Sequence, residues 1–125
     1  MKLVDTTVAV DHLRGAPPAT ELLTRLISDG ETLVSSEITR FELLAGVRKA
    51  ELEALEVFFS SLAWVPIDQE ISRTAGTLAQ GLRRSHSGID DADYLIAATA
   101  IVLEADLLTT NVRHFPMIKS LHAPY

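Results

Sequence analysis

Residues 88–100 of the chain read Gly88-Ile89-Asp90-Asp91-Ala92-Asp93-Tyr94-Leu95-Ile96-Ala97-Ala98-Thr99-Ala100. Three acids, Asp90, Asp91 and Asp93, open this stretch, and ten residues without a charge follow, from Tyr94 to Leu103. Neighbouring carboxylates repel one another, and burial disfavours their charged form. An acidic cluster at the mouth of a buried helix is therefore costly unless a cation removes the repulsion. The stretch is interpreted as one wall of a divalent-metal site.

The rest of the composition is that of a small globular protein. The chain has 125 residues, 47% of them hydrophobic, and no cysteine. This length predicts a single domain over residues 1–125 with one core. The absence of cysteine excludes disulfides, thiolate catalysis and zinc–cysteine sites, and it favours a cytoplasmic location. A membrane span needs about 20 apolar residues, more than the uncharged run provides. The first residues also lack the apolar region of a signal peptide, so no membrane association is expected.

The net charge of −6 bears on the choice of partners. A general binder of duplex DNA is usually basic. Carboxylates that hold metal ions add negative charge that the ions reverse locally, so an acidic chain can still act on nucleic acid. The excess of acids therefore indicates either a local acidic pocket or a basic partner.

Short apolar segments alternate with amphipathic segments of helical period. We expect strands at about 2–5, 32–35, 63–66 and 107–109, and helices at about 6–14, 17–29, 36–45, 49–61, 68–84 and 90–105. A further short edge strand is expected at 117–121. This alternation is typical of a parallel sheet that is covered by helices on both faces.

Two polar side chains follow predicted strands, and sites in such sheets form at the carboxyl ends of the strands. Asp5 ends the first strand, and Asn111 lies two residues past the fourth. Two further acids are placed by helical phase. In the helix at 36–45 the expected apolar stripe is Ile38, Phe41 and Ala45, and Glu42 projects beside or into it.

Asp93 is four residues from Ile89 and three from Ile96, so it also lies on the inward face of its helix. A buried charge must be paired or bound to metal. The candidate ligands are all oxygens, which favours Mg²⁺ or Mn²⁺ over zinc.

Four segments resemble the PIN-domain ribonucleases and, more closely, the VapC toxins of bacterial and archaeal toxin–antitoxin pairs. They occur in the family's order and at roughly its separations, across nearly the whole chain. The segments are Val4-Asp5-Thr6-Thr7, Phe41-Glu42-Leu43-Leu44-Ala45-Gly46, Asp93-Tyr94-Leu95-Ile96-Ala97-Ala98-Thr99-Ala100 and Thr109-Thr110-Asn111-Val112-Arg113-His114-Phe115. The resemblance implies a three-layer α/β/α fold with a short central, mostly parallel sheet.

The resemblance also implies that Asp5, Glu42 and Asp93 form a catalytic core that binds Mg²⁺ or Mn²⁺. Asn111 is counted as the fourth catalytic residue, at a position where many PIN domains have an acid. An amide is a poorer Mg²⁺ ligand than a carboxylate, which argues against a tightly held second metal. The accessory candidates are Thr6 and Thr110, whose hydroxyls would meet a water or a substrate phosphate, and Asp90 and Asp91.

The activity that the resemblance implies is hydrolysis of RNA phosphodiester bonds by a metal-dependent endoribonuclease. Substrates in the family are structured RNAs of translation, such as tRNA or rRNA, and their cleavage arrests translation and growth. The implied partners are a VapB-like antitoxin that covers the groove, in a toxin–antitoxin hetero-oligomer, and a second copy of the chain in a homodimer.

Simpler roles exist for several of these residues. Asp5 could be a helix N-cap, Asp93 could form a capping box with Asp90, and Asn111 could cap the following turn. His114 is read as structural. Arg83 and Arg84 either contact RNA phosphates or pair with the end of their helix.

Two other functions are alternatives to the nuclease. A non-catalytic PIN module that only engages a partner would not need the intact acids. A phosphoacceptor signalling domain would carry an acidic pair after the first strand and a lysine after the last. Asp5 stands alone in this chain, and no lysine lies between Lys49 and Lys119.

Overall fold

A computed structural model describes every residue from Met1 to Tyr125. Its sheet has four short strands in the order β3-β2-β1-β4. The strands are β1 (Lys2–Val4), β2 (Leu33–Ser36), β3 (Ala63–Val65) and β4 (Asp106–Leu108). Each pair of neighbours is parallel, which confirms the parallel sheet expected from the alternating pattern.

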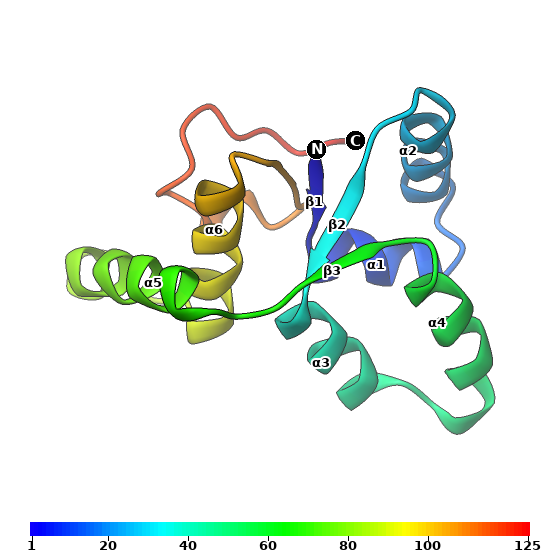
Figure 1. The fold of residues 1–125 in the computed structure, drawn as a ribbon, viewed down its shortest axis with the longest axis horizontal. Helices are drawn as coiled ribbons and strands as arrows, with labels where there is room; N and C mark the ends of the chain where they lie inside the picture. The colour runs from blue at the N-terminus through cyan, green and yellow to red at the C-terminus, as the bar shows by residue number, and fades with distance from the viewer.

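Six α-helices surround the sheet. They are α1 (Thr6–Leu13), α2 (Pro17–Ser28), α3 (Glu37–Gly46), α4 (Leu52–Phe59), α5 (Gln69–Leu82) and α6 (Asp91–Leu103). Figure 1 shows α5 and α6 on one side of the sheet and α1, α2 and α4 on the other, which is the expected α/β/α arrangement. None of these helices has the length and apolar character needed to cross a membrane.

The central strand β1 is buried between two apolar layers. Val4 and Leu108 belong to a cluster with residues of α1, α2 and α4, whereas Leu3 and Leu107 belong to a cluster with residues of α6. Successive side chains of a strand point to opposite faces, so a strand covered on both sides must be apolar throughout. This explains why the segments that form the sheet read as short apolar runs.

The expected inward face of α3 is wrong at two of its three residues, since only Ile38 packs against a core cluster. Phe41 is 67% exposed and Ala45 is also exposed, while the buried residues are Thr39 and Leu43. A buried threonine needs a hydrogen-bond partner, and Thr39 Oγ1 finds one in Thr6 Oγ1 at 3.1 Å. Because the Thr6 proton is donated to Glu42, Thr39 is the donor in this contact. The apolar pattern misled because it cannot recognise a polar residue whose partner comes from another helix.

Two other expectations are corrected. The predicted helix at 49–61 is a 3-10 helix, Lys49–Glu51, followed by α4, whose first residue Leu52 is 42% exposed. No strand forms at 117–121. The backbone turns at Ser120, where φ is +58°, and this left-handed conformation interrupts an extended segment.

Arg40 ties α3 to the elements beside it. Its Nε and Nη2 donate to the two carboxylate oxygens of Glu37 at 2.7 and 3.1 Å. The guanidinium carbon lies 4.2 Å from the ring centroid of Trp64 in β3 and 5.0 Å from that of Phe59 in α4. An arginine that contacts an aromatic face is attracted by the ring quadrupole. Arg40 therefore holds α3, which carries Glu42, against the rest of the fold.

We expect Arg40→Ala to lower the free energy of unfolding by about 1–2 kcal/mol, because both the ion pair and the ring contacts are lost. Urea denaturation followed by circular dichroism measures this. Arg73→Ala is the matched control, since Arg73 lies on the exposed side of α5 and bonds only Gln69. Equal losses in the two variants would show that Arg40 is not an anchor.

Candidate active site

Parallel pairing places two polar residues side by side at the carboxyl ends of β1 and β4. Val4 is opposite Leu108 in the register, and the next residues are Asp5 and Thr109. The backbone N–H of Asp5 continues the pairing by donating to Leu108 O at 2.9 Å. Both side chains are buried, and Asp5 is only 4% exposed.

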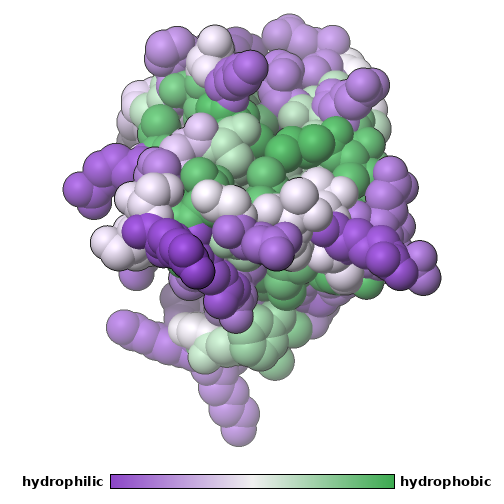
Figure 2. All heavy atoms as spheres, turned by 90° about the vertical axis from the view of Figure 1, so that its left-hand side faces the viewer, coloured by the Kyte–Doolittle hydropathy of each residue, from purple (hydrophilic) through white to green (hydrophobic).

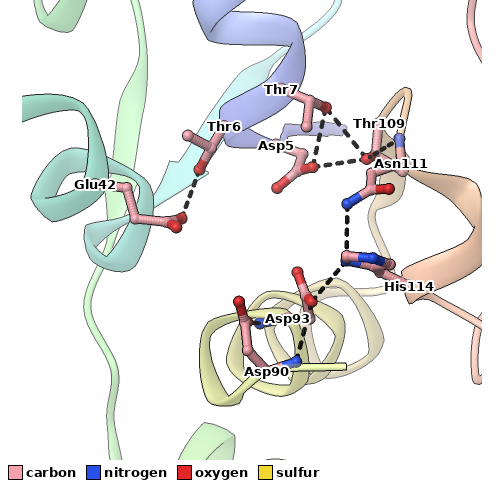
Figure 3. A network of polar contacts seen from close by, with 9 residues as sticks. All are labelled: Asp5, Thr6, Thr7, Glu42, Asp90, Asp93, Thr109, Asn111 and His114. Atoms are coloured by element: carbon pink, nitrogen blue, oxygen red, sulfur yellow. Dashed lines mark hydrogen bonds and ion pairs between the residues drawn. The ribbon is translucent and has the colours of Figure 1, made fainter. Parts of the chain in front are cut away.

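One oxygen of Asp5 is bound by hydroxyl groups and the other is not. Thr109 Oγ1 donates to Asp5 Oδ2 at 2.6 Å, and Thr7 Oγ1 donates to the same atom at 3.1 Å. Asp5 occupies the N-cap position of α1, yet its side chain makes no capping bond, so that simpler role does not account for it. In Figure 3 its other oxygen points toward the space that Glu42 and Asp93 also face.

Asp93, in the first turn of α6, also has one carboxylate oxygen bound by protein groups. Its backbone N–H donates to Asp90 Oδ1 at 2.9 Å, and its Oδ2 accepts from the Asp90 N–H at 3.3 Å. The predicted capping box is therefore present. His114 Nδ1 lies 3.0 Å from the same Oδ2. The remaining oxygen of Asp93 points toward Asp5 (Figure 3).

Glu42 closes the third side from α3. Its Oε1 accepts a hydrogen bond from Thr6 Oγ1 at 2.8 Å. The side chain is half-buried and extends toward Asp5 and Asp93 across the opening (Figure 3). Each of the three carboxylates thus has one oxygen bound to a protein donor, while the other oxygen is without one.

Burial and neighbouring negative charges raise the pKa values of Asp93 and Glu42. Burial raises the pKa of Asp93 to about 6, and the negative charges of Asp90 and Asp5 add to this, whereas the Asp90 N–H and His114 oppose it. Burial also raises the pKa of Glu42, partly offset by the Thr6 hydroxyl, and Asp5 and Asp90 raise it further. The site repels its own negative charge, which is the condition that a bound cation relieves.

The donor set fits a hard divalent cation. The structure has no group of three or more His, Cys, Asp or Glu side chains already spaced to hold one ion. Mg²⁺, however, is usually bound through one or two carboxylates and several waters. Asp5, Asp93 and Glu42 offer three unpaired carboxylate oxygens to such a partly hydrated ion.

Asn111 lies on the same side of the site as Asp5 and Asp93. Its backbone N–H donates to Thr109 Oγ1 at 3.0 Å, and its side-chain nitrogen is 2.7 Å from His114 Nδ1. Its side chain makes no capping bond to the 3-10 helix that follows, Val112–His114. The fold therefore brings Asp5, Glu42, Asp93 and Asn111 around one opening, as expected, with Asn111 reaching Asp93 through His114.

The accessory candidates are in different places. The Thr6 hydroxyl is engaged by Glu42, and Thr110 is exposed while its backbone N–H donates to Thr7 Oγ1 at 3.1 Å. Asp90 caps α6 beside the opening. Asp91 is exposed and forms an ion pair with Arg83.

Three residues of this network escaped the sequence analysis as site residues: Thr7, Thr109 and His114. The run Thr109-Thr110-Asn111 after a strand was the only available signal. It could not show which threonine points inward, because the register of β1 with β4 decides that. His114 had no metal-binding spacing with the other histidines.

A hollow of about 580 Å³ adjoins the site between α1, α3 and α4. Glu42 forms part of its wall, so the hollow and the carboxylate site share this residue. Its floor is apolar and its rim is charged, with lining residues that include Val10, Leu13, Arg14, Leu43, Arg48 and Ala54.

Comparisons with known proteins agree on one family. The model of the PIN domain family matches residues 2–119. Ribonuclease VapC19 of Mycobacterium tuberculosis (strain CDC 1551 / Oshkosh) is 63% identical over 125 residues, which is 100% of both chains. Ribonuclease VapC10 of the same strain is 41% identical over 100% of this chain and 93% of its own. The solved structure of VapBC2 from Rickettsia felis, bound to a DNA fragment from its promoter, aligns with a TM-score of 0.83 at 25% identity, covering 98% of this chain and 96% of that one.

The raised pKa of Asp93 predicts a stability effect in the metal-free protein. An ordinary Asp loses its proton near pH 3.8, whereas folded Asp93 keeps it up to about 6. The folded state therefore binds more protons between these values, so stability from this group falls as the pH rises toward 7. We expect Asp93→Asn to be more stable than wild type by up to about 1 kcal/mol at neutral pH, after allowance for partial exposure.

Urea unfolding in the presence of a chelator, at pH about 5 and about 7.5, measures this difference. The advantage of Asp93→Asn should shrink at the lower pH, where wild-type Asp93 is protonated. Asp91→Asn, on the exposed side of the same helical turn, is the control and should show no such gain. A less stable Asp93→Asn at both pH values would contradict the repulsion.

Proposed function

The chain belongs to the PIN-domain family, and from this premise we propose that it is the ribonuclease toxin of a VapBC-type toxin–antitoxin pair. Its whole length, residues 1–125, acts as one catalytic domain. The reaction is hydrolysis of RNA: water adds to phosphorus, and one P–O ester bond breaks to leave a hydroxyl end and a phosphate end. The residues that carry it are Asp5, Glu42, Asp93 and Asn111.

The observation that carries this proposal is that each of the three carboxylates has one oxygen bound to a protein donor and one oxygen without a donor. Asp5 Oδ2 is bound by Thr7 and Thr109, Asp93 Oδ2 by the first turn of α6, and Glu42 Oε1 by Thr6. A surface carboxylate can leave one oxygen to water, but Asp5 is only 4% exposed and Glu42 and Asp93 are half-buried, so an oxygen without a protein donor costs free energy there. Three acids that each leave one oxygen unpaired toward a common space are arranged to bind something that is not part of the chain.

The ligand we propose is Mg²⁺ or Mn²⁺, held by Asp5 and Asp93 with Glu42 beside them. When bound, such an ion lowers the pKa of a water and neutralises charge on the phosphate. The carboxylates supply orientation, because their hydrogen-bonded oxygens cannot rotate freely. The unpaired oxygens can also accept hydrogen bonds from the attacking water and hold it in line with the phosphorus.

No side-chain nucleophile is required by this arrangement. The Thr6 hydroxyl is committed to Glu42, and Thr7 and Thr109 are committed to Asp5. Thr110 is the exposed hydroxyl at the rim, and we assign it the role of contacting a substrate phosphate. We further propose a structured RNA of translation, tRNA or rRNA, as the substrate, and hence action in the cytoplasm with arrest of growth.

Loss of the Asp93 carboxylate should abolish cleavage. We expect Asp93→Asn to cleave RNA at least about 100-fold more slowly, because an amide oxygen is a weak ligand for Mg²⁺. Mapping of new RNA 5′ ends after expression measures the cleavage, and growth curves measure the arrest. Asp91→Asn is the matched control and should cut like wild type.

Retention of full activity by Asp93→Asn would exclude the proposed chemistry. A protein that bound its partner with Asp5→Ala and never cut RNA would instead be a non-catalytic module.

The partner that we propose is an antitoxin of the VapB kind, in a hetero-oligomer that also contains a second copy of the chain. The hollow between α1, α3 and α4 supports a docking position for the antitoxin. Its apolar floor fits a hydrophobic segment, its rim offers Arg14, Arg48 and Glu51 to polar ends, and its wall includes Glu42. A segment seated there would lie next to the carboxylates and obstruct them.

We expect Ala54→Arg to weaken neutralisation by the cognate antitoxin at least about tenfold, because a long charged side chain would fill the hollow. RNA cleavage without antitoxin should be unchanged, since Ala54 is exposed on α4 and is not one of the four proposed catalytic residues. Val57→Arg, on α4 but outside the hollow, is the control. Titration of antitoxin into a cleavage assay measures both variants, and equal inhibition of the two would place the antitoxin elsewhere.

A further inference from the structure

The contacts of His114 Nδ1 set a constraint on hydrogen bonding. This atom lies 3.0 Å from Asp93 Oδ2 and 2.7 Å from the side-chain amide of Asn111. A ring nitrogen is either a donor or an acceptor, and an ionised carboxylate only accepts. Nδ1 must therefore carry a proton in order to bond Asp93.

The same proton decides the orientation of Asn111. A protonated Nδ1 cannot also accept from an amide NH₂ group, so the atom that Asn111 turns toward the ring must be its oxygen. The two ends of an amide have nearly the same shape, and the hydrogen-bond network determines which way it faces. Asn111 thus contributes its oxygen to the imidazole, and this contact uses one of the two lone pairs of that oxygen.

We propose that His114 is a positioning residue of the active site. Its single Nδ1–H is shared between Asp93 Oδ2 and the Asn111 amide oxygen. This contact keeps the other Asp93 oxygen turned into the site. This inference rests on the proposed nuclease function of the carboxylates. His114 does not itself touch the reacting atoms.

The proposal gains weight from the chain of contacts that His114 completes. Thr109 Oγ1 donates to Asp5, and Asn111 N–H donates to Thr109 Oγ1. The Asn111 side chain then meets His114, and His114 meets Asp93. The segment 109–114 therefore connects the two catalytic aspartates along one side of the site, as Figure 3 shows.

The segment is also fixed to the fold at both ends. Thr109 is fully buried directly after β4, and Phe115, which follows His114, is 1% exposed in the core cluster of α6. The backbone of His114 is therefore held between two buried residues, and its hydrogen bonds orient the imidazole. The segment thus sets the separation of Asp5 from Asp93.

The first test is spectroscopic and needs neither RNA nor a metal. Nitrogen-15 NMR of the histidine rings in the chelator-treated protein, assigned with His114→Ala, identifies the ring atom that carries the proton. We expect protonation at Nδ1 of His114. A neutral ring protonated only at Nε2, with a bare Nδ1, would overturn the proposal.

The second test uses variants that replace one ring nitrogen at a time. His114→Asn places an amide NH₂ where Nδ1 lies, and His114→Gln places it where Nε2 lies. We expect His114→Ala and His114→Gln to weaken Mn²⁺ binding about 10–100-fold, as loss of a group that orients a metal ligand does. His114→Asn should remain within about threefold of wild type, because it restores the donor.

The Mn²⁺-dependent increase in melting temperature measures this binding, and kcat and KM for RNA are measured in parallel. The decrease should fall on kcat, since in this proposal His114 acts on Asp93 and not on the substrate. His122→Ala, an exposed histidine far from the carboxylates in sequence and outside their network, is the control and should match wild type. Equal behaviour of His114→Asn and His114→Gln, or wild-type Mn²⁺ affinity in His114→Ala, would overturn the proposal.

The two proposals can fail separately. If wild type neither responds to Mn²⁺ nor cuts RNA, the proposed function fails, while the protonation of Nδ1 still decides the role of His114. If wild type does both and the ring is protonated only at Nε2, the nuclease stands and His114 is not its positioning residue.

Discussion

The parallel pairing of β1 between β2 and β4 is the constraint on which the rest of the structure depends. Because Val4 lies opposite Leu108, the chain must present Asp5 and Thr109 next to one another where the two strands end. β1 and β4 are only three residues long, and the register pairs every residue of one with a residue of the other. A shift of one residue would exchange the two apolar faces of β1 and would turn Asp5 away from its hydroxyl partners.

Burial of the carboxylates costs free energy, and nearby hydroxyl groups offset part of this cost. Asp93 and Glu42 both have raised pKa values, chiefly because burial disfavours their charged forms. The hydroxyls of Thr6, Thr7 and Thr109 offset part of that cost by donating to one oxygen of Glu42 or Asp5. The other oxygens are left without a protein donor. Under the proposed function, this loss of stability in the metal-free state is the counterpart of affinity for a cation.

The elements around the site have two proposed roles, which are catalysis and contact with the antitoxin. The first turn of α6 and the segment 109–114 fix the aspartates from one side, while α3 supplies Glu42 from the other. Arg40 holds α3 through Phe59 and Trp64, and the apolar hollow next to α3 shares Glu42 with the site. A single helix therefore connects the proposed catalytic centre to the proposed antitoxin contact. Inhibition by a partner in the hollow would need no long-range change of conformation.

The sequence by itself determined the parallel α/β fold, and local patterns predicted the positions of Asp5 and Asp93. Glu42 was assigned from a face of α3 on which Phe41 and Ala45 are exposed. Apolar runs mark buried strands, an acid marks the end of β1, and helical phase turns Asp93 inward. The tertiary structure alone decided the partners of those acids. Thr109 was separated from Thr110 by the pairing of β1 with β4, and the buried face of α3 was set by the Thr6–Thr39 contact instead of by Phe41. His114 meets Asp93 across 21 positions of sequence. Such contacts depend on distances between elements, and no local pattern encodes these distances.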